Sequence, residues 1–281
     1  MEAEKRTPDY SNANKLVVSN KYIQAIHPDR MSINAMKLFR LAITQCRMND
    51  ENFYEYDFQI RDCASAMNID ESNMYREIQN MCMNLMQMVL KVGTNDVKDD
   101  WEIRHIFEVC RYTRKTGTVS ILLHKDMTEL FLQLKTNFTR IPIVNILSMK
   151  SKYSIRIYEL LCERMMSHYP YADETAEITL SLEDVRKATG TDRKKTYDKI
   201  SNFKNIVWKP SIREIEEVAN WKIEVEEIKC GRIISGFKLT IWSIFGYQHS
   251  AKSPLRQAEK VPKAAQPKTD HVQMSIFDFD I

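Results

Sequence analysis

The sequence is poor in glycine and has no long apolar run, and these absences exclude several classes of protein. With six glycines in 281 residues, it contains no glycine-rich dinucleotide fingerprint. The phosphate-binding pattern G-x-x-x-x-G-K-[ST] is also missing. No apolar stretch approaches the roughly 18 residues that a bilayer requires, and the polar start MEAEKRTPDYSNANK has no signal core. We therefore expect a cytoplasmic protein with no membrane segment.

Patterns for metal binding and catalysis are missing too. The six histidines form no H-x-H or H-E-x-x-H pair, so a metal-assisted nicking or hydrolytic site has no ligand set. The six cysteines form no C-x-x-C pair, and we expect them to be reduced and mostly buried. The sequence therefore predicts a protein that is not an enzyme and needs no metal or other cofactor. A nicking enzyme or helicase is the alternative, which metal- or nucleotide-dependent turnover would reveal.

What the sequence does contain is an internal repeat with an offset of 122 residues. The segment FQIRDCASAMNIDESNMYREIQNM, from Phe58, aligns with LSLEDVRKATGTDRKKTYDKISNF, from Leu180. Amphipathic helices are predicted before both segments, over 32–47 and 151–166. The identical residues and the apolar positions agree in the same alignment, which favours two copies of one module. The identical pairs are Asp62/Asp184, Ala66/Ala188, Asp70/Asp192, Tyr75/Tyr197, Ile78/Ile200 and Asn80/Asn202.

Each copy predicts the same order of elements: helix, short strand, short helix, turn, longer helix and β-hairpin. The short helices should end at Asn68 and Gly190, and the hairpins should span 101–124 and 221–242. This order is typical of a winged helix. The predicted fold class is therefore α+β, with two tandem winged-helix domains related by internal duplication and a disordered C-terminal tail. The predicted boundaries are 1–13 (disordered), 14–147, 148–248 and 249–281 (flexible tail).

The longer helix of the second copy, TDRKKTYDKISNFKNIVWKP (191–210), combines an apolar face with a cationic one. Tyr197, Ile200, Phe203 and Val207 share the face expected to pack, and Pro210 should end or kink the helix. The opposite face suits DNA, because Lys binds phosphate or guanine and Asn pairs with adenine. A merely solvated face is the alternative. The predicted DNA-binding residues here are Arg193, Lys194, Lys195, Lys199, Asn202, Lys204 and Asn205.

The first copy differs from the second at the equivalent helix, predicted over 71–90. This helix has few cations and carries methionines at 74, 81, 83, 86 and 88, which suggests core packing or contact with another protein chain. A basic cluster instead occupies the tip of the first wing. Arg111, Arg114 and Lys115 are predicted there as phosphate or minor-groove contacts.

Two stretches carry a resemblance to a known family. SKYSIRIYELL (151–161) and FKNIVWKPSIREI (203–215) resemble segments of the second domain of the Rep_3, or initiator replication, family of plasmid replication initiators, and NKLVVSNKYIQA is similar to its opening strand. The resemblance implies binding to direct repeats (iterons) at a plasmid origin, opening of the origin, and recruitment of host replication proteins. It implies a second domain that makes the main base contacts and a first domain that dimerises and adds contacts. The host initiator and the replicative helicase are the implied further partners. A winged-helix repressor without a replication role is the alternative.

The last residues of the chain form a separate pattern. Three prolines and five cations within 248–271 predict a disordered linker. The following residues, Gln273, Met274, Ser275, Ile276 and Phe277, resemble the peptide by which bacterial proteins dock onto the replicative sliding clamp. Gln273 would be the polar anchor, and Ile276 and Phe277 would fill the apolar pocket. A tail that folds back onto its own domain is the alternative.

Overall fold

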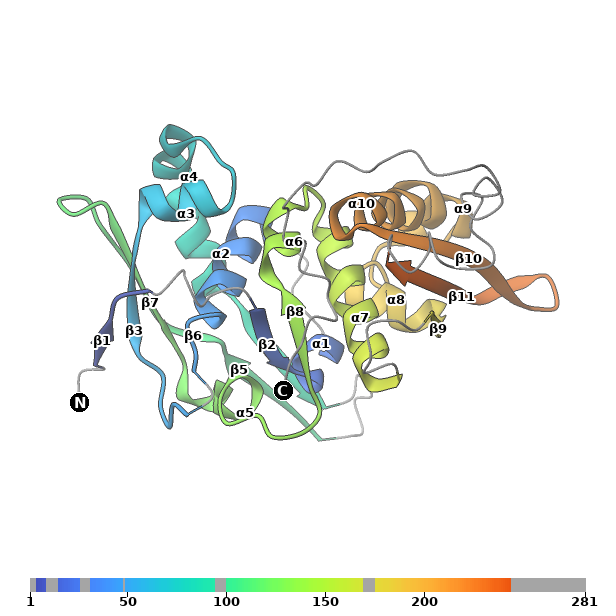
Figure 1. Cartoon of the computed structure of the whole chain (residues 1–281), viewed down its shortest axis with the longest axis horizontal. Helices are drawn as coiled ribbons and strands as arrows, with labels where there is room; N and C mark the ends of the chain where they lie inside the picture. The colour runs from blue at the N-terminus through green and yellow to red at the C-terminus, as the bar shows by residue number, and fades with distance from the viewer. Residues whose placement is uncertain are drawn as a thin grey trace, which may run out of the picture.

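The computed structural model describes residues 4–8, 15–25, 31–47, 49–93, 100–168 and 175–243. The first module occupies the left of Figure 1 and the second the right, and the long helix α7 (Lys152–His168) runs between them. The predicted linker and clamp peptide, including Gln273–Phe277, lie outside the described residues.

The two modules contain the following elements. In the first they are β1 Lys5–Arg6, β2 Lys15–Ser19, α1 Asn20–Gln24, α2 Ile33–Ile43, β3 Glu55–Gln59, α3 Ile60–Ala66, α4 Glu71–Met86, β4 Val89–Gly93, β5 Trp101–His105, β6 Phe107–Thr113, β7 Thr118–Leu123, the 3₁₀ turn η1 Lys125–Met127, α5 Thr128–Phe131, β8 Phe138–Pro142 and α6 Ile143–Ser148. In the second they are α7, β9 Ala176–Ser181, α8 Leu182–Thr189, the 3₁₀ turn η2 Lys195–Tyr197, α9 Ile200–Phe203, the π-helical turn η3 Lys204–Trp208, α10 Lys209–Ala219, β10 Trp221–Cys230 and β11 Ile233–Ser243.

Equivalent strands pair in the same way in both modules. The first has the strand order β1-β3-β7-β6, and the second has β10-β11-β9. In each, the strand before the short helix pairs antiparallel with the last strand of the hairpin, so that Phe58 lies opposite Val119 and Leu180 opposite Phe237. All four of these side chains are buried. The repeat seen in the sequence is thus matched by a repeated sheet and core.

The short helices end where the sequence predicts. Gly190 closes α8 in the left-handed region, with φ 64°, and Asn68 has φ 52° directly after α3. Glycine adopts this conformation easily because it has no Cβ to crowd the backbone, and asparagine tolerates it because its short polar side chain can hydrogen-bond locally. At the other end of α8, the Ser181 hydroxyl accepts a hydrogen bond from the backbone N–H of Asp184 at 2.9 Å.

Three boundaries in the first module differ from the prediction. The helix predicted over 32–47 is α2, which ends at Ile43. Helix α4 ends at Met86 rather than at Leu90, and Val89–Gly93 forms a strand that pairs with Trp101–His105. The wing is therefore β6 and β7 alone, closed by the turn 114–117. The valines at 89 and 92 favour a strand at this point.

The methionines of α4 and of the residues directly after it divide between the two expected roles. Met74, Met81 and Met88 are each 1% exposed and belong to the core. Met83 and Met86 are 53% and 39% exposed. A cavity of about 510 Å³ beside them is also lined by Cys82 and by residues of β6.

The two modules meet at a buried group of charges, which we call the interface triad: Arg40, Arg156 and Glu159. From α2, the Arg40 Nε and Nη2 donate to the two carboxylate oxygens of Glu159 at 2.8 and 3.1 Å. On α7, Arg156 also donates to Glu159, and its Nη2 reaches the carbonyl of Ile23 in α1 at 2.8 Å. Burial alone would raise the pKa of Glu159, but the two arginines outweigh it and lower that pKa.

Candidate nucleic-acid interface

The segment that should read DNA, which we call the reading segment (191–219), is not one regular helix. Its helix begins at Ile200, and the preceding residues form turns and the 3₁₀ turn η2. The prediction of a helix from 191 onward is therefore wrong for its first nine residues. In the first module, Asp70 caps α4 by accepting hydrogen bonds from the backbone of Ser72 and Asn73. The equivalent Asp192 lies in a turn and caps no helix.

The helix continues through Pro210 instead of ending there. Proline has no N–H to donate, and in a regular α-helix its ring collides with the carbonyl four residues earlier. In this chain the preceding turn, Lys204–Trp208, is π-helical, and a wider turn relieves that collision. Trp208, the last residue of this turn, stacks on Phe237 of β11, with ring centroids 4.2 Å apart and ring planes at 15° to each other. The π-helical turn is therefore anchored on the sheet of its own module.

Side chains also fix the irregular start of the segment. The hydroxyls of Tyr197 and Tyr153 are 3.2 Å apart, and Lys194 Nζ donates to the Tyr153 hydroxyl at 3.4 Å. The Lys194 ammonium lies 5.8 and 5.9 Å from the centres of the two tyrosine rings. From α8, Arg186 donates to the carbonyl of Tyr197. These contacts hold residues 194–198 in place without a helix.

Three of the predicted DNA-binding residues in the reading segment hold parts of the module together. Lys194 belongs to the tyrosine cluster just described. The amide of Asn202 donates to the carbonyl of Thr196 at 3.0 Å, across the start of the helix. Lys204 binds Glu227 of the wing strand β10, and this hydrogen bond holds the pKa of Glu227 below its usual value. These three side chains join parts of the module to one another.

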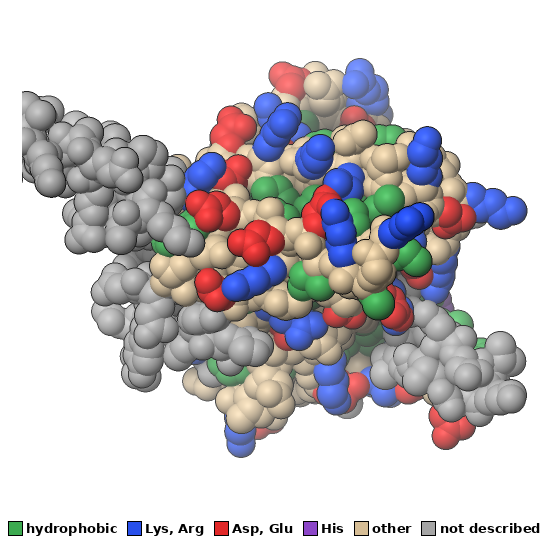
Figure 2. Space-filling model, turned by 90° about the vertical axis from the view of Figure 1, so that its right-hand side faces the viewer, with side chains coloured by type: hydrophobic (Ala, Val, Ile, Leu, Met, Phe, Trp, Pro, Cys, Tyr) green, Lys and Arg blue, Asp and Glu red, His purple; other side chains and the backbone are tan. Residues whose placement is uncertain are grey.

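The other predicted residues of the segment point outward. Lys195, Lys199 and Asn205 are exposed, and so is Arg193, whose Nε lies 3.9 Å from Asp192. Within the described residues, no ion pair involves Lys195 or Lys199. Figure 2 shows this end of the molecule, where blue Lys and Arg side chains stand out from the upper part with green apolar surface between them.

The outer face continues beyond the predicted DNA-binding residues. Lys209 and Arg213 extend it along α10, and both are exposed. Ile206 lies among them with 54% of its surface exposed. A helical wheel contains the signal for Ile206, because it stands about 100° from the buried Val207.

The basic cluster of the first wing is partly paired. Arg111 Nη1 lies 3.1 Å from Glu55 Oε1 on β3, whereas Arg114 and Lys115 are exposed in the turn 114–117. Gly117 closes this turn with φ 62°, and a Cβ there would lie 2.7 Å from the Tyr75 hydroxyl of α4. The turn is thus packed against α4. Figure 1 places this turn and α9 toward opposite ends of the long axis, so the two basic surfaces are separate.

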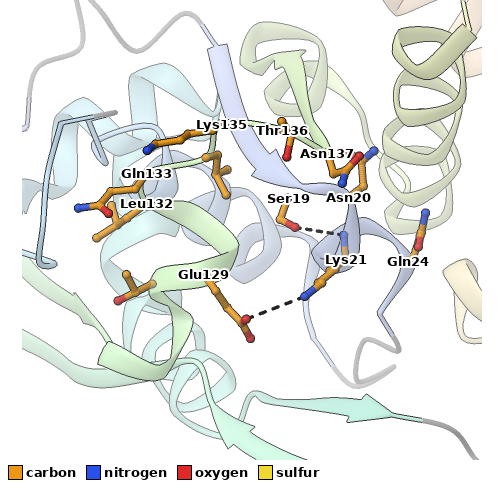
Figure 3. Close-up of a pocket in the computed structure, with 12 residues that line it drawn as sticks. Ser19, Asn20, Lys21, Gln24, Glu129, Leu132, Gln133, Lys135, Thr136 and Asn137 are labelled. Carbon is orange, nitrogen blue, oxygen red and sulfur yellow. Dashed lines mark hydrogen bonds and ion pairs between the residues drawn. The ribbon is translucent and has the colours of Figure 1, made fainter.

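A polar cavity of about 820 Å³ opens in the first module, between α1 and the residues from α5 to β8. Lys21 reaches toward Glu129 across it, with Nζ 4.0 Å from Oε2, and amides of Gln133 and Asn137 lie at its rim (Figure 3). All its lining residues come from the first module. The cavity and the reading segment are therefore separate features.

The described residues contain neither a metal-binding cluster nor a membrane-spanning helix. No group of three or more His, Cys, Asp or Glu side chains among them is arranged to hold a metal ion. None of their helices is long and apolar enough to span a membrane.

Comparison with known families identifies both modules. Residues 15–162 match the family model "Initiator Replication protein, WH1", and residues 181–241 match "Initiator Rep protein, WH2". The chain belongs to the initiator replication family. Its two winged-helix domains, predicted from the internal repeat, are thereby confirmed, and so is the family resemblance.

Individual relatives are distant in sequence. A curated "Replication initiation protein" of Escherichia coli is 21% identical over 216 residues, which are 76% of this chain and 64% of that protein. The chain thus spans less than two thirds of this initiator's length. Among solved structures, that of the Pi initiator protein in complex with iteron DNA has a TM-score of 0.65 at 16% identity, covering 82% of this chain and 97% of the other. Domains 2 and 3 of RctB match with a TM-score of 0.45 at 11% identity, over 76% of this chain and 82% of theirs.

Proposed function

We propose that this protein is a non-enzymatic plasmid replication initiator that binds iterons at the origin, promotes origin opening and recruits host replication proteins in the bacterial cytoplasm. The observation that carries the proposal is the cationic outer face of the reading segment, in a chain whose two domains match an initiator family. The Pi initiator, which shares the fold, was crystallised with iteron DNA, and this supports the same ligand here.

In this proposal the second domain makes the main DNA contacts. Lys195 and Lys199 are exposed and carry no ion pair within the described residues, so they can neutralise phosphates without first breaking a contact. Arg193 and Asn205 are the other outward candidates. Lys194, Asn202 and Lys204 would act mainly by holding the segment in shape, since their side chains already bind Tyr153, Thr196 and Glu227.

The first domain would add phosphate contacts through Arg114 and Lys115 and would take part in dimerisation. The proposed C-terminal peptide, Gln273–Phe277, would dock onto the bacterial sliding clamp and bring it to the origin. A flexible linker would raise the effective concentration of the clamp near bound DNA. The host initiator and the replicative helicase would be recruited at the same place.

The first experiment is selection of binding sites from random duplex DNA by the full-length chain, followed by footprinting of the selected site in tandem copies. We expect a motif that is protected as regular repeats. The Lys195→Ala/Lys199→Ala variant should bind all DNA more weakly and should flatten the salt dependence by about one unit of slope per lost phosphate contact. Weak binding with no selected motif would overturn the proposal.

A matched control removes the same amount of charge elsewhere in the domain. Lys222 and Lys238 lie on the sheet and pair with Glu216 at 3.3 Å and Glu177 at 3.1 Å. Their double substitution by alanine should leave the salt slope unchanged. An equal loss in both double variants would show that net charge alone, and not the reading segment, attracts DNA.

Replication and clamp binding need their own tests. A plasmid carrying this gene and the neighbouring repeats should replicate, whereas a repressor would bind the repeats without supporting replication. The Ile276→Ala/Phe277→Ala variant should lose binding to purified sliding clamp in surface plasmon resonance and keep its affinity for the selected DNA. Undiminished clamp binding by this variant would exclude the peptide as the docking site.

A further inference from the structure

Ile206 is an apolar side chain on the outer face of the reading segment. It is 54% exposed, while its apolar neighbours Phe203, Val207 and Trp208 are 0%, 0% and 3% exposed. These three fill the core side of the same helix, so Ile206 adds little to that packing. Single exposed apolar residues are common on proteins. The position of Ile206, more than its exposure, is informative.

That position is in the π-helical turn on the exposed side of the reading segment. Along the chain, Ile206 lies between Asn202, near the start of the helix, and Lys209, the first residue of α10. Asn205 is its neighbour in the chain, and Lys209 and Asn205 are both exposed. The exposed Ile206 is thus close in the chain to an exposed amide and an exposed ammonium group, and it is the seventh residue of a helix that starts at Ile200.

These three kinds of side chain match three features of a DNA groove. Lysine binds phosphate or guanine, and asparagine pairs with adenine in the major groove. An apolar side chain has one partner there, the 5-methyl group of thymine. Helices of this class place residues near their N-terminal end against the base edges. Facing cytosine, the same side chain would cover a polar N4 amino group and leave it without a hydrogen bond.

We propose that Ile206 packs against the 5-methyl group of one thymine in each bound repeat and so selects thymine at that position. This inference rests on the proposed function, since it requires sequence-specific DNA binding by the second domain. It adds an apolar specificity determinant to a face otherwise made of cations and amides.

The test removes only the methyl group. Each thymine of the selected site, in single-copy DNA, is replaced in turn by deoxyuridine, and the affinity of the full-length protein is measured by fluorescence anisotropy. At one position we expect the affinity to fall about four-fold, because one buried methyl group would no longer be removed from water. Ile206→Ala should bind the thymine site more weakly and should show no further loss at that position with deoxyuridine.

A matched control is Ile233→Ala, on the wing. Ile233 is 74% exposed, and its substitution should leave the four-fold deoxyuridine effect intact. The inference is overturned if every deoxyuridine site binds wild-type protein equally well, or if the loss persists in Ile206→Ala. It is also overturned if Ile206→Ala weakens only cooperative binding to tandem repeats, which would assign the side chain to a contact between neighbouring protomers. In these cases sequence-specific binding, and with it the proposed function, still stands. Failure to select any DNA site would overturn both the proposed function and the inference about Ile206.

Discussion

The interface triad gives the strongest prediction about stability. Glu159→Gln keeps the shape of the side chain but leaves Arg40 and Arg156 buried without their counter-charge. Oε2 accepts one hydrogen bond from each arginine. A glutamine NH₂ at that place would oppose both donors, and hydrogen bonds to charged groups contribute about 1.5–3 kcal/mol each. We therefore expect a loss of about 3–5 kcal/mol, the usual cost of breaking a buried ion pair.

The measurement is urea unfolding of the full chain, followed by circular dichroism and tryptophan fluorescence. In thermal unfolding, the same loss corresponds to a fall in Tm of about 10 °C for a chain of this size. Glu183→Gln is the matched control, because Glu183 pairs with Lys187 on the exposed surface of α8, and it should leave the midpoint nearly unchanged. A Glu159→Gln variant as stable as Glu183→Gln would refute the role given to the triad.

The difference between wild type and Glu159→Gln should also depend on pH. Because folding lowers the pKa of Glu159, its contribution is fully present above the pKa of an unfolded glutamate, about 4.3. It is lost as pH falls through the lower pKa of the folded state. The difference in unfolding free energy should therefore be constant from pH 5 to 8 and should shrink below about pH 4. A difference that grows toward acid would contradict the sign of this shift.

Three further predictions concern single elements. A hydrogen bond from Cys110 lowers the pKa of the Cys82 thiol, so Cys110→Ala should slow the alkylation of Cys82 by iodoacetamide at neutral pH. Mass spectrometry measures the rate of alkylation, and an unchanged rate would contradict the hydrogen bond between the two thiols. Gly117→Ala should destabilise the first wing because of its φ of 62° and the contact with Tyr75, and thermal unfolding should show partial recovery with Tyr75→Phe. Trp208→Ala should cost about 3–5 kcal/mol in urea unfolding, and a loss below 1 kcal/mol would contradict its role as an anchor.

The modular fold follows from local signals that the sequence displays directly. A short strand leads into a helix that ends at a residue suited to positive φ, and this happens twice at a fixed offset. Gly190 and Asn68 occupy the expected conformations, because the backbone preference of such residues needs no distant partner. The end of α4 is harder to predict, since Val89 and Leu90 form a strand only through pairing with β5, more than ten residues further along.

The reading segment shows where local signals fail. Asp70 and Asp192 are identical in the repeat, yet the first caps a helix and the second does not. What differs lies outside the segment: Tyr153 on α7 and Arg186 on α8 hold the backbone around Tyr197 in a turn. The sequence therefore shows where the cations of this segment lie, and their part in DNA binding stays a prediction. Tertiary contacts decide which of these side chains point outward and which bind to other groups within the protein.

This division has a consequence for recognition. A regular helix from residue 191 would distribute its cations around a single helical surface. In the structure, Lys195 and Lys199 instead lie in the turns before the helix, and the exposed residues of its first turns include Asn205 and Ile206. Cations placed before the helix can bind the phosphate backbone while the helix enters the groove. The contacts of Lys194, Asn202 and Lys204 hold this arrangement without any ligand, so the proposed binding of DNA would need little ordering of the segment. If the proposed function holds, affinity and base selection would belong to neighbouring but separate parts of one short segment.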